Sequence, residues 1–461
     1  MIQLVISLIA ILILTLFAFK YPPITFAIFL LTSGYGDGYG INGFLLSKGY
    51  GPYEYLISIP LIISVFVTFI ILWKKYLKKS ISRRLFFLAL LAIFSMIWAG
   101  LVSINNSRDI ITILRDISGI KIYAIIFVLA YWNDIKAHKL FIFCLIFQLS
   151  IAACLMLFPY SSISVLSARN YLPLEYYAPL AQPESFTGNL ARISPNTVRA
   201  AAQFYNENAY GYYSVFGVLF GILIPFRKKS IKSVLIGSLL FLTGVIGWTV
   251  TVSRGATLGI ILALSLFYFR YLIAIKTKKQ LKSIFISTFV IFGLIILILS
   301  LINLPWEGIS KVFQSGFTDN SSVYRMTAEQ NAPEVITRYP LFGIPQAEKV
   351  YGYFSPHETI SYYSAEFGIP IGLIVLYLIA TSLFGSTFIP NKLLIEKSIS
   401  GWYARLAFIL AWFNFITGFS NATAAGCMSW LLIGISCIPW VFNYPKSFNI
   451  VEIIKIKGGG N

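Results

Sequence analysis

Long, uninterrupted runs of apolar residues constrain this chain more than any single motif does. Each run approaches the roughly 20 residues that an α-helix needs to cross about 30 Å of hydrocarbon. Hydrophobic residues make up 57% of the 461 residues and charged residues only 11%, which leaves no polar stretch for a separate soluble domain. The runs are rich in Leu, Ile and Phe and lack the alternation of a membrane β-strand. The sequence therefore predicts an all-α, polytopic transmembrane helical bundle, a single integral membrane domain over residues 1–461.

Twelve or thirteen spans are expected. The first run, from Ile2 to Phe19, has no basic segment before it and no small-residue cleavage site, which favours a retained span over a signal peptide. The run from Pro22 to Gly36 is short, so we expect a re-entrant segment or a short tilted helix there. Further spans are predicted at residues 53–73, 85–104, 112–132, 140–158, 209–226, 233–252, 255–273, 284–303, 363–385, 403–420 and 426–442.

The net charge of +19 is concentrated in the links between spans. Cytoplasmic links of membrane proteins are enriched in Lys and Arg, and every basic cluster falls on one side when the spans alternate. The clusters bracket spans and form no continuous stripe, so they favour contact with membrane lipids and argue against nucleic-acid binding. They lie at Lys74–Arg84, at Lys136 and Lys139, at Arg227–Lys232, at Lys276–Lys282, at Lys392 and Lys397, and after Lys446.

Two long polar segments are then predicted on the outer face, at residues 159–208 and 304–361. In so apolar a chain, the segments that collect Arg, Glu and His are the places where chemistry is expected. The second segment ends near His357, one of only two histidines, and we interpret it as a partly helical active-site cap. The other histidine, His138, lies among cytoplasmic lysines and is expected to have no catalytic role.

The residues around His357 fit a pattern that opens a helix. Ser355 is suited to cap the helix, Pro356 to occupy its first position and Glu358 to reach back to the cap. This predicts that His357 lies in the first turn, where the helix dipole favours a neutral imidazole that can act as a general base. The free N–H groups of that helix end would also suit a phosphate oxygen. The alternative is a surface histidine at a helix start.

Five cationic residues are candidates for binding a pyrophosphate group. Guanidinium forks match phosphate oxygens, and a pyrophosphate leaving group needs its charge neutralised. Each candidate also has a simpler reading: an arginine at a span end can reach the membrane surface, and a carboxylate such as Asp116 can neutralise its neighbour. Lys121, deep in the predicted span 112–132, needs a partner or a wet cavity. The candidates are Arg115, Lys121, Arg254, Arg325 and Arg338.

Neither a metal nor a cofactor is expected. Glu329, Glu334 and Glu348 in the second outer segment lack a compact Mg²⁺ or Ca²⁺ pattern, so arginines are expected to replace a metal. All four cysteines lie inside apolar runs, with neither disulfide nor zinc spacing, and are expected to be small core residues.

Four short motifs occur in order between Asn206 and Ile379. They are Asn206-Glu207-Asn208-Ala209-Tyr210-Gly211, Ser253-Arg254-Gly255, Pro340-Leu341-Phe342-Gly343, and Pro356-His357-Glu358 followed by Glu366-Phe367-Gly368-Ile369-Pro370-Ile371-Gly372. Together they resemble the bacterial O-antigen ligase and O-antigen polymerase family. One position differs, because Glu358 stands where the family usually has Asn.

The resemblance implies a fold of glycosyltransferase-C-like type and a metal-independent, inverting glycosyl transfer on the periplasmic side of the bacterial inner membrane. The donor would be an oligosaccharide on undecaprenyl pyrophosphate, and the acceptor a sugar hydroxyl. By position, His357 matches the family's essential histidine, Arg254 the Ser-Arg-Gly arginine and Arg325 the loop arginine. Glu358, Ser355 and Asn208 are expected to support them, and the Glu358 carboxylate would raise the pKa of His357.

The motifs do not name the acceptor. A polymerase would join a second lipid-linked repeat, and Arg169, Arg192 and Arg199 in the first outer segment could form a second anionic lipid site. A ligase would transfer the glycan to lipid A-core or to a protein. We favour the polymerase, working in lipopolysaccharide or other polysaccharide biosynthesis with a chain-length regulator and a flippase as partners. A polyprenyl-linked glycan flippase or another transporter is a different class that fits the span count, although transporters gather polar groups at mid-membrane. A non-catalytic assembly scaffold would not need His357.

Overall fold

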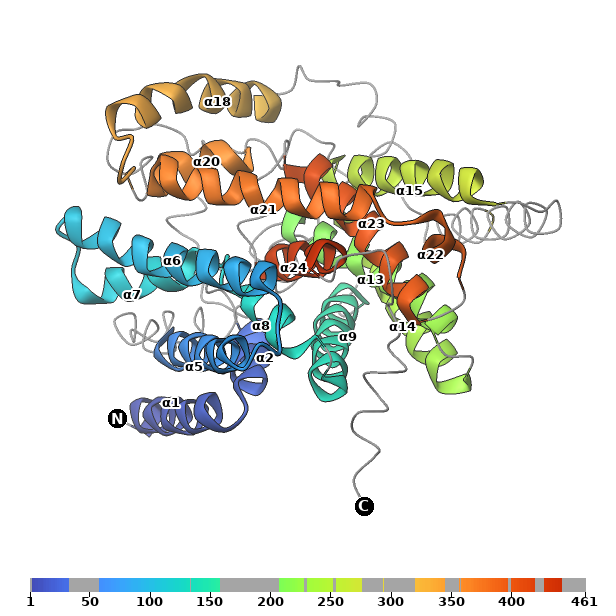
Figure 1. Ribbon diagram of the computed structural model, residues 1–461, viewed down its shortest axis with the longest axis horizontal. Helices are drawn as coiled ribbons and strands as arrows, with labels where there is room; N and C mark the ends of the chain where they lie inside the picture. The colour runs from blue at the N-terminus through green and yellow to red at the C-terminus, as the bar shows by residue number, and fades with distance from the viewer. Residues whose placement is uncertain are drawn as a thin grey trace.

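The computed structural model describes residues 2–32, 58–132, 134–157, 207–227, 230–251, 254–275, 293, 320–344, 356, 358–396, 399–418 and 427–441, and every regular element in these ranges is an α-helix (Figure 1). Six of the described helices are long and apolar enough to cross a membrane. The predicted all-α, multi-pass membrane fold is therefore confirmed. These six are α5 (Ser58–Leu77), α6 (Arg83–Asn105), α9 (Ile135–Leu157), α14 (Ile231–Thr251), α15 (Arg254–Ala274) and α21 (Ile369–Thr387).

Other helices complete the described part of the bundle. The run predicted as re-entrant or tilted forms a helix of 11 residues, α2 (Pro22–Thr32), that packs on α1 (Ile2–Lys20), α5 and α9. The predicted span at 284–303 lies outside the described residues, apart from Gly293. The remaining described helices are α7 (Ile110–Gly119), α8 (Ala124–Tyr131), α13 (Glu207–Arg227), α18 (Asn320–Arg338), α20 (Thr359–Phe367), α22 (Asn391–Ile395), α23 (Ile399–Gly418) and α24 (Cys427–Val441).

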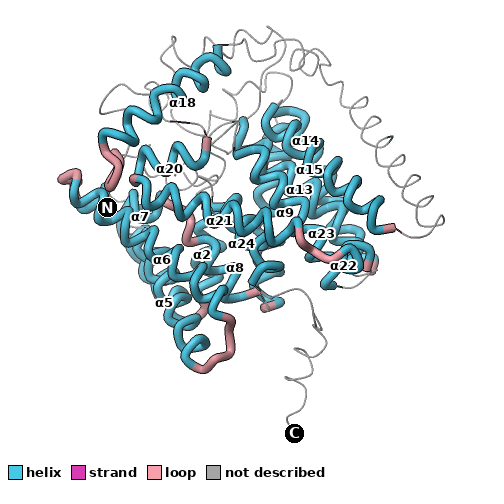
Figure 2. Tube along the Cα trace, turned by 45° about the horizontal axis from the view of Figure 1, so that its top comes forward, coloured by secondary structure: helices cyan, strands magenta, loops and turns pink. Residues whose placement is uncertain are grey.

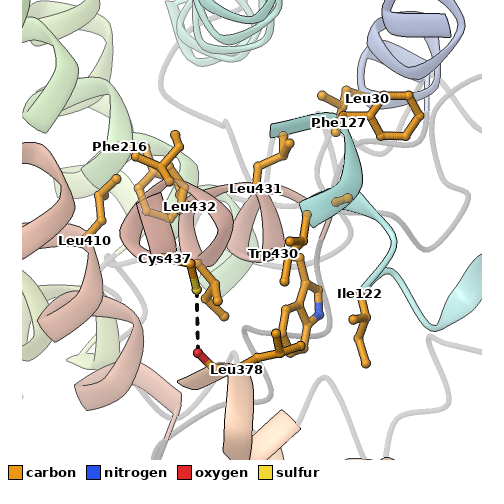
Figure 3. Close-up of a cluster of buried hydrophobic side chains, with 14 of the residues drawn as sticks. Leu30, Ile122, Phe127, Phe216, Leu378, Leu410, Trp430, Leu431, Leu432 and Cys437 are labelled. Carbon is orange, nitrogen blue, oxygen red and sulfur yellow. Dashed lines mark hydrogen bonds between the residues drawn. The ribbon is translucent and has the colours of Figure 1, made fainter. Parts of the chain in front are cut away.

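The core is built around α24. Its Trp430, Leu431 and Leu432 are buried and reach toward α8, α13, α21 and α23 (Figure 3). The Cys437 thiol is also buried, and its Sγ lies 3.8 Å from the carbonyl oxygen of Leu378 on α21. Cys437 and Cys144 behave as the small core residues that the sequence predicts.

The closest helix pair is α13 with α14, which cross through glycines. A Cβ atom on Gly221 would lie 2.6 Å from the amide nitrogen of Phe241, and one on Gly244 would lie 2.6 Å from the amide nitrogen of Val218. Only glycine permits the two backbones to approach this closely, which is how small residues pack helices inside a membrane.

The predicted span 112–132 is not one helix. It breaks into α7 and α8, and Lys121 in the break has a φ of 55°. The prediction that Lys121 lies two turns inside a continuous helix is therefore wrong. Tyrosine side chains take the place of helical hydrogen bonds at the break: Tyr123 donates to the Ser118 carbonyl and Tyr363 donates to the Ile120 carbonyl, each over 3.0 Å.

The predicted span 363–385 is also divided. Gly368, with a φ of 84°, separates the short helix α20 from α21. Helix α18 lies outside the bundle and rests on α20, at the top left of Figure 1 and again in Figure 2. The second outer segment is thus partly helical, as the sequence predicts.

Candidate functional site

The segment that follows His357 opens α20 in a different way from the predicted one. The helix begins at Thr359, and its N-cap is Glu358, whose Oε2 accepts a hydrogen bond of 2.6 Å from the N–H of Ser361. Pro356 is not helical. The prediction of a Ser355 cap with His357 in the first turn is therefore wrong, as is the prediction of a helix end left free for phosphate, because a carboxylate already occupies it. His357 and Ser355 themselves lie outside the described residues.

This cap also explains the difference from the family motif. Asn, Asp and Ser are the preferred N-cap residues because a side-chain oxygen can accept from the N–H two or three positions later. Glu358 makes the same bond to Ser361 through a longer side chain. The residue after the histidine is thus a helix cap in this chain, which an Asn could also be.

A second carboxylate, from α18, also binds the backbone at the start of α20. Oε1 of Glu329, on α18, accepts a hydrogen bond of 2.6 Å from the backbone N–H of Glu358. Arg325 lies one turn before Glu329 on α18, so this bond ties the helix that carries Arg325 to the residue next to His357. The Arg325 side chain lies outside the described residues.

The C-terminal end of α23 connects α20 to α15. The Thr359 hydroxyl, at the start of α20, donates over 3.3 Å to the carbonyl of Gly418, the last residue of α23. The neighbouring Thr417 packs directly on Gly259, where a Cβ atom would overlap its methyl group. Gly259 is five residues after Arg254, which begins α15. The starts of α15 and α20 therefore meet at the end of α23.

Helix α13 reaches the same place. Tyr212 packs edge-on against Phe413 of α23, with ring centroids 5.9 Å apart. Asn208 lies one turn before Tyr212 and Thr417 one turn after Phe413, so the beginning of α13 is level with the end of α23. The side chains of Asn208 and Arg254 lie outside the described residues.

The Pro-Leu-Phe-Gly motif packs against the backbone at the end of α20. A Cβ atom on Gly343 would lie 2.5 Å from the amide nitrogen of Gly368 and 2.6 Å from the carbonyl oxygen of Ala365. The N–H of Ile344 donates over 2.8 Å to that Ala365 carbonyl. Gly343 and Gly368 also have φ values of 60° and 84°, which glycine adopts without strain. Two motifs that are separate in the sequence thus form one backbone junction.

Helix α6 buttresses this junction. The Trp98 ring stacks on Phe342 at 5.4 Å, and its Nε1 donates over 3.0 Å to the Phe367 carbonyl. The N–H of Ile369 donates over 2.8 Å to the Pro340 carbonyl. These contacts fix the C-terminal ends of α18 and α20 on the bundle.

Of the two alternatives for Arg115 and Asp116, the ion pair is present. The Arg115 guanidinium lies 3.1 Å from Asp116 Oδ1, and the Ser103 hydroxyl donates over 2.6 Å to Oδ2. Lys121 is buried at the helix break, next to the Ile120 carbonyl that binds Tyr363 of α20. The bond from Tyr363 to Ile120 thus joins the helix break to α20.

Arg338 is not brought to the start of α20. Its side chain is exposed and pairs with Glu334 over 3.4 Å. Arg325 and Arg338 are 13 residues apart on α18, which is about 20 Å along a helix axis. The prediction that both serve one pyrophosphate is therefore not supported by their positions. Arg169, Arg192 and Arg199 lie outside the described residues.

His138 lies at the other end of the bundle. Its Nδ1 is 2.9 Å from the Tyr403 hydroxyl, beside an apolar cavity of about 100 Å³ that Trp132 and Trp402 help to line. The residue is half-buried and hydrogen-bonded. In the described part of the chain, no three His, Cys, Asp or Glu side chains gather as a metal site.

Three of the helices that meet at this point, α15, α18 and α20, lie within one region that matches a known family. Residues 239–377 match the O-antigen ligase family model. The match runs from within α14 to within α21 and includes Arg254, Arg325 and His357. The family resemblance drawn from the motifs is therefore confirmed for this region. None of the curated proteins matches the chain significantly.

The O-antigen ligase match supports an enzyme of the O-antigen ligase and polymerase type within a multi-pass membrane protein. The sequence did not predict the roles of Glu329 and Gly418 in the site. The sequence pattern around Glu329 bears only on metal binding, and Gly418 belongs to no motif. Both act through bonds with the backbone or a hydroxyl of residues far along the chain, at separations of 29 and 59 residues, for which sequence alone carries no pattern.

Proposed function

We propose that this chain is a polysaccharide polymerase that joins undecaprenyl-pyrophosphate-linked oligosaccharide repeats on the periplasmic side of the bacterial inner membrane. The observation that carries the proposal is the meeting of the starts of α15 and α20 at the end of α23, with α18 bonded to the same point. Arg254 begins α15, Arg325 lies on α18, and His357 directly precedes Glu358, the N-cap of α20, in the sequence. The O-antigen ligase match over residues 239–377 supports the reaction type.

The positions of basic residues support the proposal that the meeting point faces the periplasm. Lys74 and Lys75 end α5, Arg83 begins α6, and Lys392 lies between α21 and α23, all at the ends of these helices opposite to α20. Because basic links face the cytoplasm, the meeting point would face the periplasm.

In the proposed reaction, an acceptor sugar hydroxyl attacks the anomeric carbon of the donor glycan. The new C–O bond forms as the bond to undecaprenyl pyrophosphate breaks, with inversion at that carbon. His357 accepts the hydroxyl proton as general base. Arg254 and Arg325 stabilise the negative charge that develops on the departing pyrophosphate. The two carboxylates at the start of α20 keep the His357 segment in place while the reaction proceeds.

A ligase is the second candidate function, because the matching family model is described as O-antigen ligase. The two functions share the donor and differ in the acceptor. The ligase would place lipid A-core or a protein where the polymerase places a second lipid-linked repeat.

The test is an assay with the full-length protein in detergent and an undecaprenyl-pyrophosphate-linked repeat, with the products separated on a gel. A ladder without any added acceptor supports the polymerase. A single shifted band that requires lipid A-core or a protein acceptor supports the ligase and contradicts the polymerase. If neither product forms while the lipid-linked repeat is intact and bound, the enzyme class is wrong.

A further inference from the structure

Helix α18 rests on the bundle through a narrow apolar stripe and, at its centre, through a hydrogen bond that Glu329 accepts. Ala328, Ala332 and Val335 are buried along one face, and Val335 packs with Ala365 of α20. Much of the rest of the described part of α18 is exposed and polar. The junction around Gly343 anchors the C-terminal end of the helix. The bond to Glu329 adds a directional constraint at the middle of the helix, nearer to Arg325.

The bond from Glu329 is suited to this purpose. Its carboxylate oxygen accepts from the Glu358 N–H over 2.6 Å, a charge-assisted hydrogen bond between residues 29 positions apart. Glu358 uses its own carboxylate to accept from the Ser361 N–H. Each glutamate thus accepts from a different backbone N–H at the start of α20, Glu329 from Glu358 and Glu358 from Ser361. Both negative charges also lie at the positive end of the α20 dipole, which favours this arrangement.

The position of this bond decides its consequence. Arg325 lies one turn before Glu329, and His357 directly precedes Glu358. The bond therefore sets how far the backbone of the proposed pyrophosphate-binding arginine is from the backbone of the proposed base. We infer that Glu329 is a positioning residue, which holds α18 in register over α20 so that Arg325 and His357 act on the same donor molecule. This inference rests on the proposed function.

The decisive comparison is between Glu329→Ala, which removes the acceptor, and Glu329→Gln, which keeps a carbonyl oxygen in nearly the same place. Glu334→Ala is the matched control, because Glu334 is an exposed glutamate on the same helix and pairs with the exposed Arg338. Loss of a hydrogen bond to a charged group corresponds to about a 10- to 100-fold effect. We expect Glu329→Ala to lower kcat by that factor with a smaller change in KM, Glu329→Gln to restore most of kcat, and Glu334→Ala to match the wild type.

A second measurement does not depend on turnover. Val335→Cys and Ala365→Cys place two thiols in one cluster between α18 and α20. Under mild oxidation the pair should cross-link efficiently when Glu329 is present and several-fold less efficiently when Glu329 is Ala. Once formed, the cross-link should also restore activity to Glu329→Ala, because it replaces the missing constraint.

The inference is overturned if Glu329→Ala keeps the wild-type kcat, if Glu329→Gln is as impaired as Glu329→Ala, or if Glu334→Ala loses as much activity. Inactive wild-type protein with unchanged cross-linking differences would mean that the proposed function fails while Glu329 still seats α18. Equal cross-linking with and without Glu329, in active protein, would mean that the function holds and the inference fails.

Discussion

Gly343 and Gly368 lie backbone to backbone, with the position of a Gly343 Cβ only 2.5 Å from the Gly368 amide nitrogen. The two glycines come from motifs 25 residues apart, and each has a positive φ. A side chain at either position would have to displace backbone atoms, which cannot move as the end of a flexible side chain can.

Replacing Gly368 with Ala should therefore destabilise the protein. The positive φ costs roughly 1–3 kcal/mol for a residue with a Cβ atom, and the overlap with the Leu341 carbonyl adds to it. We expect a clear fall in the melting temperature in detergent and reduced yield. Gly119→Ala is the control, because nothing lies within 4 Å of a Cβ at Gly119. Equal melting temperatures for the two variants would contradict the junction.

Glu358→Asn should be tolerated better than Glu358→Ala. Asn can accept from the Ser361 N–H as Glu358 does, whereas Ala leaves that donor without its cap, at a cost of about 1 kcal/mol. The melting temperature of each variant, measured beside polymer yield, checks this. A Glu358→Ala variant as stable and active as Glu358→Asn would show that the cap is dispensable.

His357→Ala should abolish product while leaving expression and melting temperature unchanged. The reason is chemical: without the imidazole no group takes the acceptor proton, and general-base catalysis typically contributes about 100- to 10,000-fold. Turnover is measured in the gel assay with lipid-linked repeat. Near-normal product from this variant would exclude His357 as the base and would favour a scaffold or transporter role for the chain.

Arg254→Lys should also lose most activity, although the charge is kept. A guanidinium presents a planar fork of donors to two phosphate oxygens, and an ammonium presents a point charge. We expect a fall of at least about 10-fold in kcat/KM. Arg338→Lys is the control, because Arg338 is exposed at the C-terminal end of α18, away from the start of α20, and should tolerate the change. Similar activity of both variants would remove Arg254 from the proposed site.

Asp134 should make the end of the bundle around His138 sensitive to acid. Burial raises the pKa of this carboxyl, but hydrogen bonds from the Tyr21 hydroxyl and from the N–H groups of Lys136 and Ala137, together with His138, outweigh burial and lower it. A lowered pKa means that the contribution to stability is present above the ordinary carboxyl pKa of about 4 and is lost as the pH falls through the folded value.

Asp134→Asn imitates the protonated side chain and keeps an oxygen for Tyr21. The wild type should be more stable than this variant at pH 7, by less than about 1 kcal/mol because Asp134 is partly exposed. The difference should shrink as the pH falls below about 4 and vanish once the pH is below the lowered pKa of the folded protein. Melting temperatures of both proteins at pH 7 and pH 3 provide the measurement, and a difference that grows in acid would contradict the assigned direction.

The helical class and the multi-pass membrane character were predictable because hydrocarbon imposes one demand on every span, a run of apolar residues whose helix satisfies its own hydrogen bonds. That demand does not predict where a span breaks, so the breaks in the two predicted spans 112–132 and 363–385 were not foreseen. At Ile120 and Gly368 the backbone leaves the helix, and the lost helical bonds are compensated by groups from elsewhere in the chain, such as the Tyr363 hydroxyl and the Pro340 carbonyl. An apolar run gives no warning of such partners.

The candidate site was predictable by residue type and order, but less so in its geometry. The family resemblance includes Arg254 and Arg325, which lie on elements that meet, and Glu358, which caps a third, whereas local pattern alone misplaced the start of α20 by favouring Ser355 over Glu358 as the cap. Arg338 has the charge that phosphate binding requires, yet it lies at the far end of α18 from Arg325. Composition identifies which residues are able to bind phosphate, and only helix geometry decides which of them can do so together.

The glycine crossing of α13 and α14 has a consequence for how the protein is assembled. Two helices whose backbones touch at Gly221 and Gly244 leave no gap for a lipid tail between them. They should therefore insert into the bilayer together as a helical hairpin and move as one rigid unit. Any opening that admits a bulky glycan would then have to come from movement of the neighbouring helices.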